Sequence, residues 1–171
     1  MIFIRESTGA IIFCCLLLGI AGYFDLKYRR IPNWLTLPAC VTGILYHAWN
    51  TGLTSGILFS LKGLGVGFVI LLIPCLMGVL GGGDVKLFAA LGSWLGSSVV
   101  INLTLYATIA GGIVALGIII KAVGFMGLKS IFFSPLSLTQ MLPVEVKKQG
   151  VPYSIPTAAG YVIYLFFGPV I

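Results

Sequence analysis

The residues best suited to chemistry in this chain are its two aspartates, Asp25 and Asp84, which lie at the ends of apolar segments. A carboxylate at membrane depth costs roughly 2.5–3.5 kcal/mol on insertion scales, so a function is expected to retain it. Two carboxyl groups brought close together share one proton, because both do not ionise easily. Such a pair acts as acid and base on a single water molecule that attacks a peptide carbonyl.

Three glycines precede the second aspartate, in the run Gly81-Gly82-Gly83-Asp84. Glycine permits backbone angles that other residues avoid, and it leaves room for another chain to lie close. A peptidase needs that room for an extended substrate. The rival interpretation is a turn before a helix capped by Asp84, with the two aspartates paired to basic neighbours: Lys27, Arg29, Arg30 or Lys86. A phosphate-binding loop is not predicted, since no Gly-Lys-Ser/Thr follows.

The elements that must position these acids are membrane-spanning helices. Hydrophobic residues make up 59% of the chain and charged residues 8%, whereas soluble domains carry about 25% charged residues. Apolar stretches near 20 residues recur, and each is long enough to cross a hydrocarbon core as a helix. We therefore expect an all-α polytopic membrane protein, a bundle of about six transmembrane helices at 7–24, 33–49, 63–80, 84–96, 100–120 and 152–170. Pro32 fits the first turn of the second helix, where its missing donor costs nothing.

Basic residues predict the orientation of the bundle. They gather in alternate connections, which belong on the cytoplasmic side, and both termini are then expected outside. Asp25 and Asp84 fall at the cytoplasmic face. The net charge of +6 is explained by this distribution, and no nucleic-acid partner is predicted. The first segment is interpreted as a retained anchor rather than a signal peptide, because Glu6 beside Arg5 weakens the basic start.

Metal and cofactor chemistry is not expected. The four cysteines lie in apolar segments without a C-x-x-C pair, and His47 is the single histidine, so neither a zinc site nor a disulfide framework is predicted.

Two further patterns concern packing. Small-xxx-small spacings at Gly63…Gly67, Gly78…Gly82 and Gly92…Gly96 predict close helix contacts, within the bundle or between copies, so a homo-oligomer is left open. The tryptophans Trp34, Trp49 and Trp94 are expected to anchor the helices near the membrane interfaces.

Three blocks of sequence resemble a known family, the type IV prepilin peptidases, which are membrane aspartyl proteases of the GxGD class. The stretch from Asp25 to Ile31-Pro32-Asn33 resembles the first-aspartate motif of that family. Gly81, Gly83 and Asp84 fill the GxGD positions of the second motif, and the stretch 151–160, with Pro152 and Tyr153, resembles a late block that opens the last helix. Ser154 departs from that block, where the family usually has glycine, and Pro156 stands where a small residue is common.

The resemblance implies an aspartic endopeptidase with Asp25 and Asp84 as its catalytic pair and no cofactor. The other residues it implies bind substrate or shape the site: Gly81, Gly82, Gly83, Lys86, Pro32, Asn33, Pro152 and Tyr153. The implied substrate is a prepilin or pseudopilin precursor, whose short basic leader is cut at the cytoplasmic face of the bacterial inner membrane. The methyltransferase region of longer members is missing, so the chain resembles the short, peptidase-only form of tight-adherence (Flp-type) pilus systems.

We therefore predict one transmembrane peptidase domain over 1–171, surrounded by the lipid bilayer. Two other functions remain open from the residues alone. A small proton- or cation-coupled transporter would use the aspartates at a gate and needs polar residues through the bundle, for which Asn102 and Thr104 are the candidates. A non-catalytic subunit of a secretion assembly would use the acids only to pair with basic loops.

Overall fold

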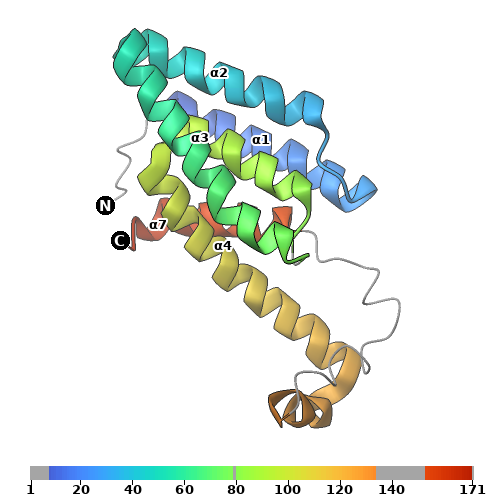
Figure 1. The fold of residues 1–171 in the computed structure, drawn as a ribbon. Helices are drawn as coiled ribbons and strands as arrows, with labels where there is room; N and C mark the ends of the chain where they lie inside the picture. The colour runs from blue at the N-terminus through green and yellow to red at the C-terminus, as the bar shows by residue number, and fades with distance from the viewer. Residues whose placement is uncertain (1–7, 79, 134–152, 171) are drawn as a thin grey trace.

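The computed structural model describes residues 8–78, 80–133 and 153–170, with side chains described outside 118–133. Within these ranges the chain forms five helices and no strand, as expected for an all-α polytopic membrane protein. The helices are α1 (Thr8–Tyr28), α2 (Asn33–Thr51), α3 (Leu53–Leu76), α4 (Gly82–Phe133) and α7 (Ser154–Phe167). In Figure 1 they form one bundle, from which the later part of α4 projects.

Three stretches within the described residues are long and apolar enough to cross a membrane: Thr8–Tyr28, Leu53–Leu76 and Gly82–Gly117. The six predicted spans are therefore not all shown, and α7 is a shorter apolar helix. Many large apolar side chains remain exposed on the outer faces of the helices, including Leu16, Leu45 and Ile73. An apolar exterior of this kind suits a lipid environment, where contact with water is not required.

Element α4 contains a reversal that divides its described length. Gly96 has φ 79°, in the left-handed region that glycine adopts without steric cost. The part of α4 before Gly96 and the part after it run in opposite directions in Figure 1. The fourth and fifth predicted segments therefore correspond to the two arms of this one element.

Two predicted boundaries are wrong. The third segment, expected at 63–80, is the helix Leu53–Leu76, and α4 continues to Phe133, through part of the connection expected after residue 120. The start of α3 was missed because the residues before Gly63 include polar side chains, among them Lys62, which lies inside the helix. A search for continuous apolar residues does not include such turns.

Glycines bring α3 and the first arm of α4 into direct backbone contact. A Cβ on Gly63 would overlap the carbonyl oxygen of Gly92, and a Cβ on Gly92 would overlap that of Gly63. One turn away, Gly67 lies against the carbonyl oxygen of Phe88 in the same manner. The contact predicted from small-xxx-small spacing is confirmed for these glycines, whereas Gly82 has no neighbour within 4 Å of such a Cβ.

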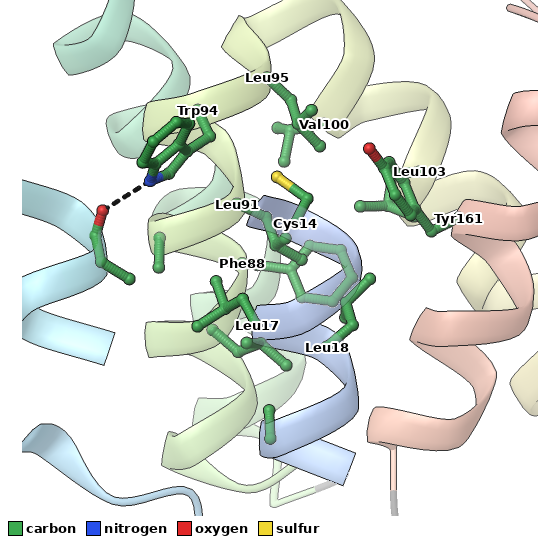
Figure 2. Packing of buried hydrophobic residues seen from close by; sticks show 14 of the residues in the cluster. Cys14, Leu17, Leu18, Phe88, Leu91, Trp94, Leu95, Val100, Leu103 and Tyr161 are labelled. Carbon is green, nitrogen blue, oxygen red and sulfur yellow. Dashed lines mark hydrogen bonds between the residues drawn. The ribbon is translucent and has the colours of Figure 1, made fainter. Parts of the chain in front are cut away.

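The core lies around the first arm of α4 and includes residues of α1, the second arm of α4 and α7. Figure 2 shows Cys14 and Leu17 of α1 near Phe88 and Leu91 of α4, and all four are buried.

Trp94 belongs to this core and is 6% exposed. Its Nε1 donates to the carbonyl oxygen of Ala39 at 2.8 Å, and its ring stacks on Phe13. The expectation that Trp94 anchors the chain at a membrane interface is wrong, because a backbone acceptor on α2 satisfies its N–H inside the bundle.

The last helix, α7, packs against the second arm of α4. A Cβ on Gly160 would lie 2.7 Å from the backbone nitrogen of Ala107. Tyr106 donates its hydroxyl to the carbonyl oxygen of Gly168 at 3.0 Å, and Asn102 Oδ1 accepts from the Val170 nitrogen at 2.7 Å. These contacts fix the position of α7, and hence of its first residue, relative to the rest of the bundle.

Candidate active site

A pocket of about 240 Å³ opens at one end of the bundle. The end of α1 and the starts of α2, α4 and α7 lie at this end in Figure 1. The pocket is lined by residues from two stretches far apart in sequence: Asp25, Arg29, Arg30 and Ile31 from the first, and Gly81, Gly82, Gly83, Asp84 and Lys86 from the second. The structure thus brings the first-aspartate stretch and the glycine stretch to one place.

Asp25 lies in the last turn of α1 and is 8% exposed. The carbonyl oxygen of Asp25 accepts from the Arg29 nitrogen at 2.8 Å, which closes the final turn of the helix. Arg29 then adopts φ 52°, the left-handed conformation that commonly ends helices. This turn directs the chain back across the end of the bundle, so that Ile31 lies against the glycine stretch.

Asp84 lies in the first turn of α4, which begins at Gly82, and is also 8% exposed. Its backbone nitrogen donates to the carbonyl oxygen of Gly81 at 3.1 Å. Asp84 lines the same pocket as Asp25. An acid in the first turn also interacts favourably with the helix dipole, so the helix-start interpretation of Asp84 is compatible with its place in the pocket.

The three glycines differ in what surrounds them. A Cβ on Gly82 would meet nothing within 4 Å, whereas one on Gly83 would lie 3.2 Å from the Cβ of Ile31. None of the three has positive φ; among the described glycines that conformation occurs at Gly52, Gly78, Gly96 and Gly168. The expectation of unusual backbone angles at Gly81, Gly82 and Gly83 is therefore wrong, and the expectation of space holds at Gly82.

Lys86 lines the pocket, whereas Pro32 and Asn33 follow its lining residue Ile31 in sequence and do not line it. Pro32 precedes α2 with φ −72° and ψ 143°, and its carbonyl oxygen accepts from the Leu35 nitrogen at 3.1 Å. Asn33, the first residue of α2, accepts a hydrogen bond of 2.8 Å from Lys86 Nζ through its Oδ1. Lys86 therefore ties α4 to α2.

The start of α7 supplies a contact to Asp25 that the sequence did not predict. Ser154 donates from its hydroxyl to Asp25 Oδ2 at 2.6 Å and from its backbone nitrogen to the same oxygen at 3.2 Å. The sequence marked Ser154 only as a departure from a family pattern, and a serine at a helix start next to the site was the available signal. Tyr153 lies beside it, with its hydroxyl 3.4 Å from that of Thr108. Pro152 lies outside the described residues.

Four basic residues were considered as ion-pair partners of the aspartates. Lys27 does not line the pocket, whereas Arg29, Arg30 and Lys86 do. Lys27 Nζ donates to the Tyr23 hydroxyl at 3.1 Å, and Lys86 donates to Asn33. Arg29 and Arg30 line the pocket together with the two acids. Across the described part of the chain, no three His, Cys, Asp or Glu side chains gather in a cluster.

Known proteins resemble most of this chain in sequence. Residues 12–116 match the model of the type IV leader peptidase family. A prepilin leader peptidase/N-methyltransferase of Xanthomonas campestris pv. campestris is 33% identical over 115 residues, which cover 63% of this chain and 39% of that protein. One of the same description from Burkholderia pseudomallei strain 1026b is 33% identical over 108 residues, 60% of this chain and 35% of that protein.

The chain therefore spans well under half the length of these curated relatives. No solved structure matches it significantly. The matched range contains both aspartates and the glycine run between α3 and α4. The family model covers more than half of the chain, and the chain belongs to the type IV leader peptidase family.

Proposed function

We propose that this protein is a membrane aspartyl endopeptidase that removes the short basic leader from type IV prepilin or pseudopilin precursors at the cytoplasmic face of the bacterial inner membrane. The observation that carries the proposal is the shared pocket: Asp25 from α1 and Asp84 from α4 line it together with the glycine run. Both carboxyl groups are 8% exposed, so each is shielded from bulk water yet reachable from the pocket.

The chemistry follows from one proton shared between two carboxyl groups. The ionised member takes a proton from a water molecule as that water attacks the scissile carbonyl carbon. The protonated member hydrogen-bonds to the carbonyl oxygen and stabilises the charge that develops there. Collapse of the tetrahedral intermediate then breaks the C–N bond as a proton reaches the leaving amine.

The open glycine turn supports an extended peptide as substrate. Gly81 and Gly82 are exposed, and the space beside Gly82 is empty of protein atoms. A substrate peptide could lie along this turn without meeting a side chain at Gly82. The carbonyl carbon of the substrate would then come within reach of the two acids. The relatives' description as prepilin leader peptidases supports prepilin-like precursors as the substrate class.

The transporter interpretation is disfavoured by its own candidate residues. It required polar side chains free to serve a path through the bundle. Asn102 Nδ2 instead donates to the Ser98 carbonyl oxygen at 2.9 Å while its Oδ1 accepts from Val170, and Thr104 donates to the Val100 carbonyl oxygen at 2.7 Å. Both side chains are engaged by the backbone, which is the ordinary role of polar residues in transmembrane helices.

Leader cleavage in cells tests the proposal. The chain is co-expressed with a candidate prepilin, and the mass of the pilin reports whether the leader is present. Asp25→Asn and Asp84→Asn should each abolish cleavage, because neither variant retains an acid–base pair. Lys27→Gln is the matched control: it lies two residues from Asp25, bonds Tyr23 rather than the pocket, and should cleave at the normal rate.

Membrane insertion of each variant is followed in parallel by detergent extraction and size-exclusion chromatography. Continued cleavage by either well-inserted asparagine variant would refute the catalytic pair. If pili fail to assemble while precursor processing stays normal, the chain is instead a non-catalytic assembly subunit.

A further inference from the structure

The two acids of the pocket have unlike surroundings. Asp25 Oδ2 accepts two hydrogen bonds from Ser154, at 2.6 Å from the hydroxyl and 3.2 Å from the backbone nitrogen. Ser154 is fully buried. Asp84 instead contacts the backbone of Gly81: its nitrogen donates to the Gly81 carbonyl oxygen, and its carboxyl group also lies against the Gly81 backbone. The pair is therefore asymmetric in its hydrogen bonding.

The donors on Ser154 favour a negative charge on Asp25. Both contacts are donated to the carboxyl group of Asp25, and hydrogen bonds donated to a carboxyl group favour its charged form. The 2.6 Å separation of the two oxygens falls in the range of O–H···O⁻ bonds to a charged acceptor, which overlaps the range of neutral O–H···O bonds. Ser154 is also the first residue of α7, which runs to Phe167, and the positive end of the helix dipole lies at that N-terminus.

Other charged and titratable groups also surround the pocket. Arg29 and Arg30 follow α1, Lys86 belongs to α4 and bonds Asn33, and all three line the pocket. Tyr153 precedes α7, and its hydroxyl lies 3.4 Å from that of Thr108. Ser154 differs from these groups because its hydroxyl and its backbone nitrogen both donate to Asp25.

We propose that Ser154 is a positioning residue that holds Asp25 as the carboxylate and thereby leaves the shared proton on Asp84. This inference rests on the proposed function and adds the role of each acid. Asp25 is the base: it accepts a proton from water as the new C–O bond forms. Asp84 is the acid: its proton passes to the carbonyl oxygen. When the C–N bond breaks, Asp25 returns its proton to the amine, and the intermediate's hydroxyl returns one to Asp84, which restores the starting state.

Selective isotope labelling reads the two protonation states directly. The chain has two aspartates, so protein labelled with ¹³Cγ-aspartate in lipid nanodiscs gives two carboxyl resonances, which Asp25→Asn and Asp84→Asn assign. At the pH of maximal activity the Asp25 resonance should be that of a carboxylate and the Asp84 resonance that of a carboxylic acid. The opposite assignment would overturn the inference. This measurement needs no cleavage, so it separates the charge assignment from the proposed function.

The pH dependence of leader cleavage tests the role of the Ser154 hydroxyl. The rate falls at low pH when the base becomes protonated. In Ser154→Ala that acidic limb should move to higher pH by about one unit, because one hydrogen bond to the charged form is lost. Ser154→Thr keeps the hydroxyl, and its cleavage rate should fall at the same low pH as that of the wild-type protein. Thr157→Ala removes another buried hydroxyl of α7, one bonded to the Tyr153 carbonyl oxygen, and should leave the limb in place.

Two results contradict the inference. A uniform loss of rate in Ser154→Ala, with the acidic limb unmoved, would make Ser154 a packing residue. An equal shift in Thr157→Ala would show that any lost hydroxyl of α7 produces the effect. If Ser154→Ala does not insert, the labelled wild-type protein still decides the charge assignment.

Discussion

Two groups of glycines do opposite work in this molecule. At the crossing of α3 and α4, Gly63 and Gly92 each lie where a Cβ would overlap the other's carbonyl oxygen. At the turn before α4, a Cβ on Gly82 would meet no atom within 4 Å. The first group removes side chains so that two backbones touch, and the second leaves the mouth of the pocket open.

The comparison teaches that spacing distinguishes the two uses. Glycines four apart share one helix face and let another helix approach. Consecutive glycines share no single face, so they do not form such a seam. Gly83 is intermediate, since it is consecutive with Gly82 yet lies against Ile31. Substitutions at the three kinds of position should therefore differ in whether they cost stability or activity.

The largest effect on stability is expected at the helix crossing. Gly63→Ala places a methyl group against a backbone carbonyl that cannot rotate away, and should destabilise the fold by about 3 kcal/mol, the upper part of the overpacking range. Thermal unfolding in detergent, followed by tryptophan fluorescence, measures the loss. Gly65→Ala is the control, since it lies on α3 with nothing within 4 Å of the added methyl. Equal stability of the two variants would mean that the crossing is not tightly packed.

An intermediate effect is expected at Gly83. In Gly83→Ala the new methyl lies 3.2 Å from the Ile31 Cβ and 3.3 Å from its backbone nitrogen, so the Ile31 turn must shift by a few tenths of an ångström. The free energy of unfolding should fall by about 1 kcal/mol, and cleavage should slow because this turn borders the pocket. Ile31→Ala in the same chain should recover only part of the loss, since the Cβ and backbone contacts remain. Full recovery would show that the outer atoms of Ile31 cause the strain.

The smallest effect on stability, with a clear effect on activity, is expected at Gly82. Gly82→Leu adds an exposed side chain and should change the free energy of unfolding by less than about 0.5 kcal/mol. If the substrate lies along this turn, the leucine occupies its space, and leader cleavage should fall roughly tenfold or more. Gly112→Leu, also with nothing within 4 Å, is the matched control on α4 and should cleave normally. Unchanged cleavage in Gly82→Leu would place the substrate elsewhere.

Features that depend on composition and local spacing were predictable from the sequence. The all-α membrane class follows from apolar segments, and the contact of Gly63 with Gly92 follows from glycine spacing. Even the meeting of Asp25 with the Gly81–Asp84 run in one pocket was expected, because segments that end at the same membrane face must return to the same end of a bundle. Their catalytic role stays a prediction.

Features set by a neighbour from elsewhere in the chain were not predictable. Trp94 was expected at an interface, but an acceptor on Ala39 of α2 satisfies its N–H in the core. Lys86 was considered as a partner of the aspartates, and its Nζ donates to Asn33 of α2. Ser154 follows Asp25 by more than one hundred residues, and no local pattern reports that the start of α7 faces the end of α1. Each of these partners is fixed only when the helices pack.

The reversal at Gly96 has a consequence for the depth of the pocket in the membrane. Residues 82–95 rise only about 20 Å at 1.5 Å per residue, less than the ~30 Å of a typical hydrocarbon core. Nearly all side chains of this arm are buried, so neighbouring helices rather than acyl chains surround it, and the arm does not have to span the hydrocarbon core. When Gly96 lies at one membrane surface, the acid at the other end of the arm therefore lies below the level of the opposite headgroups.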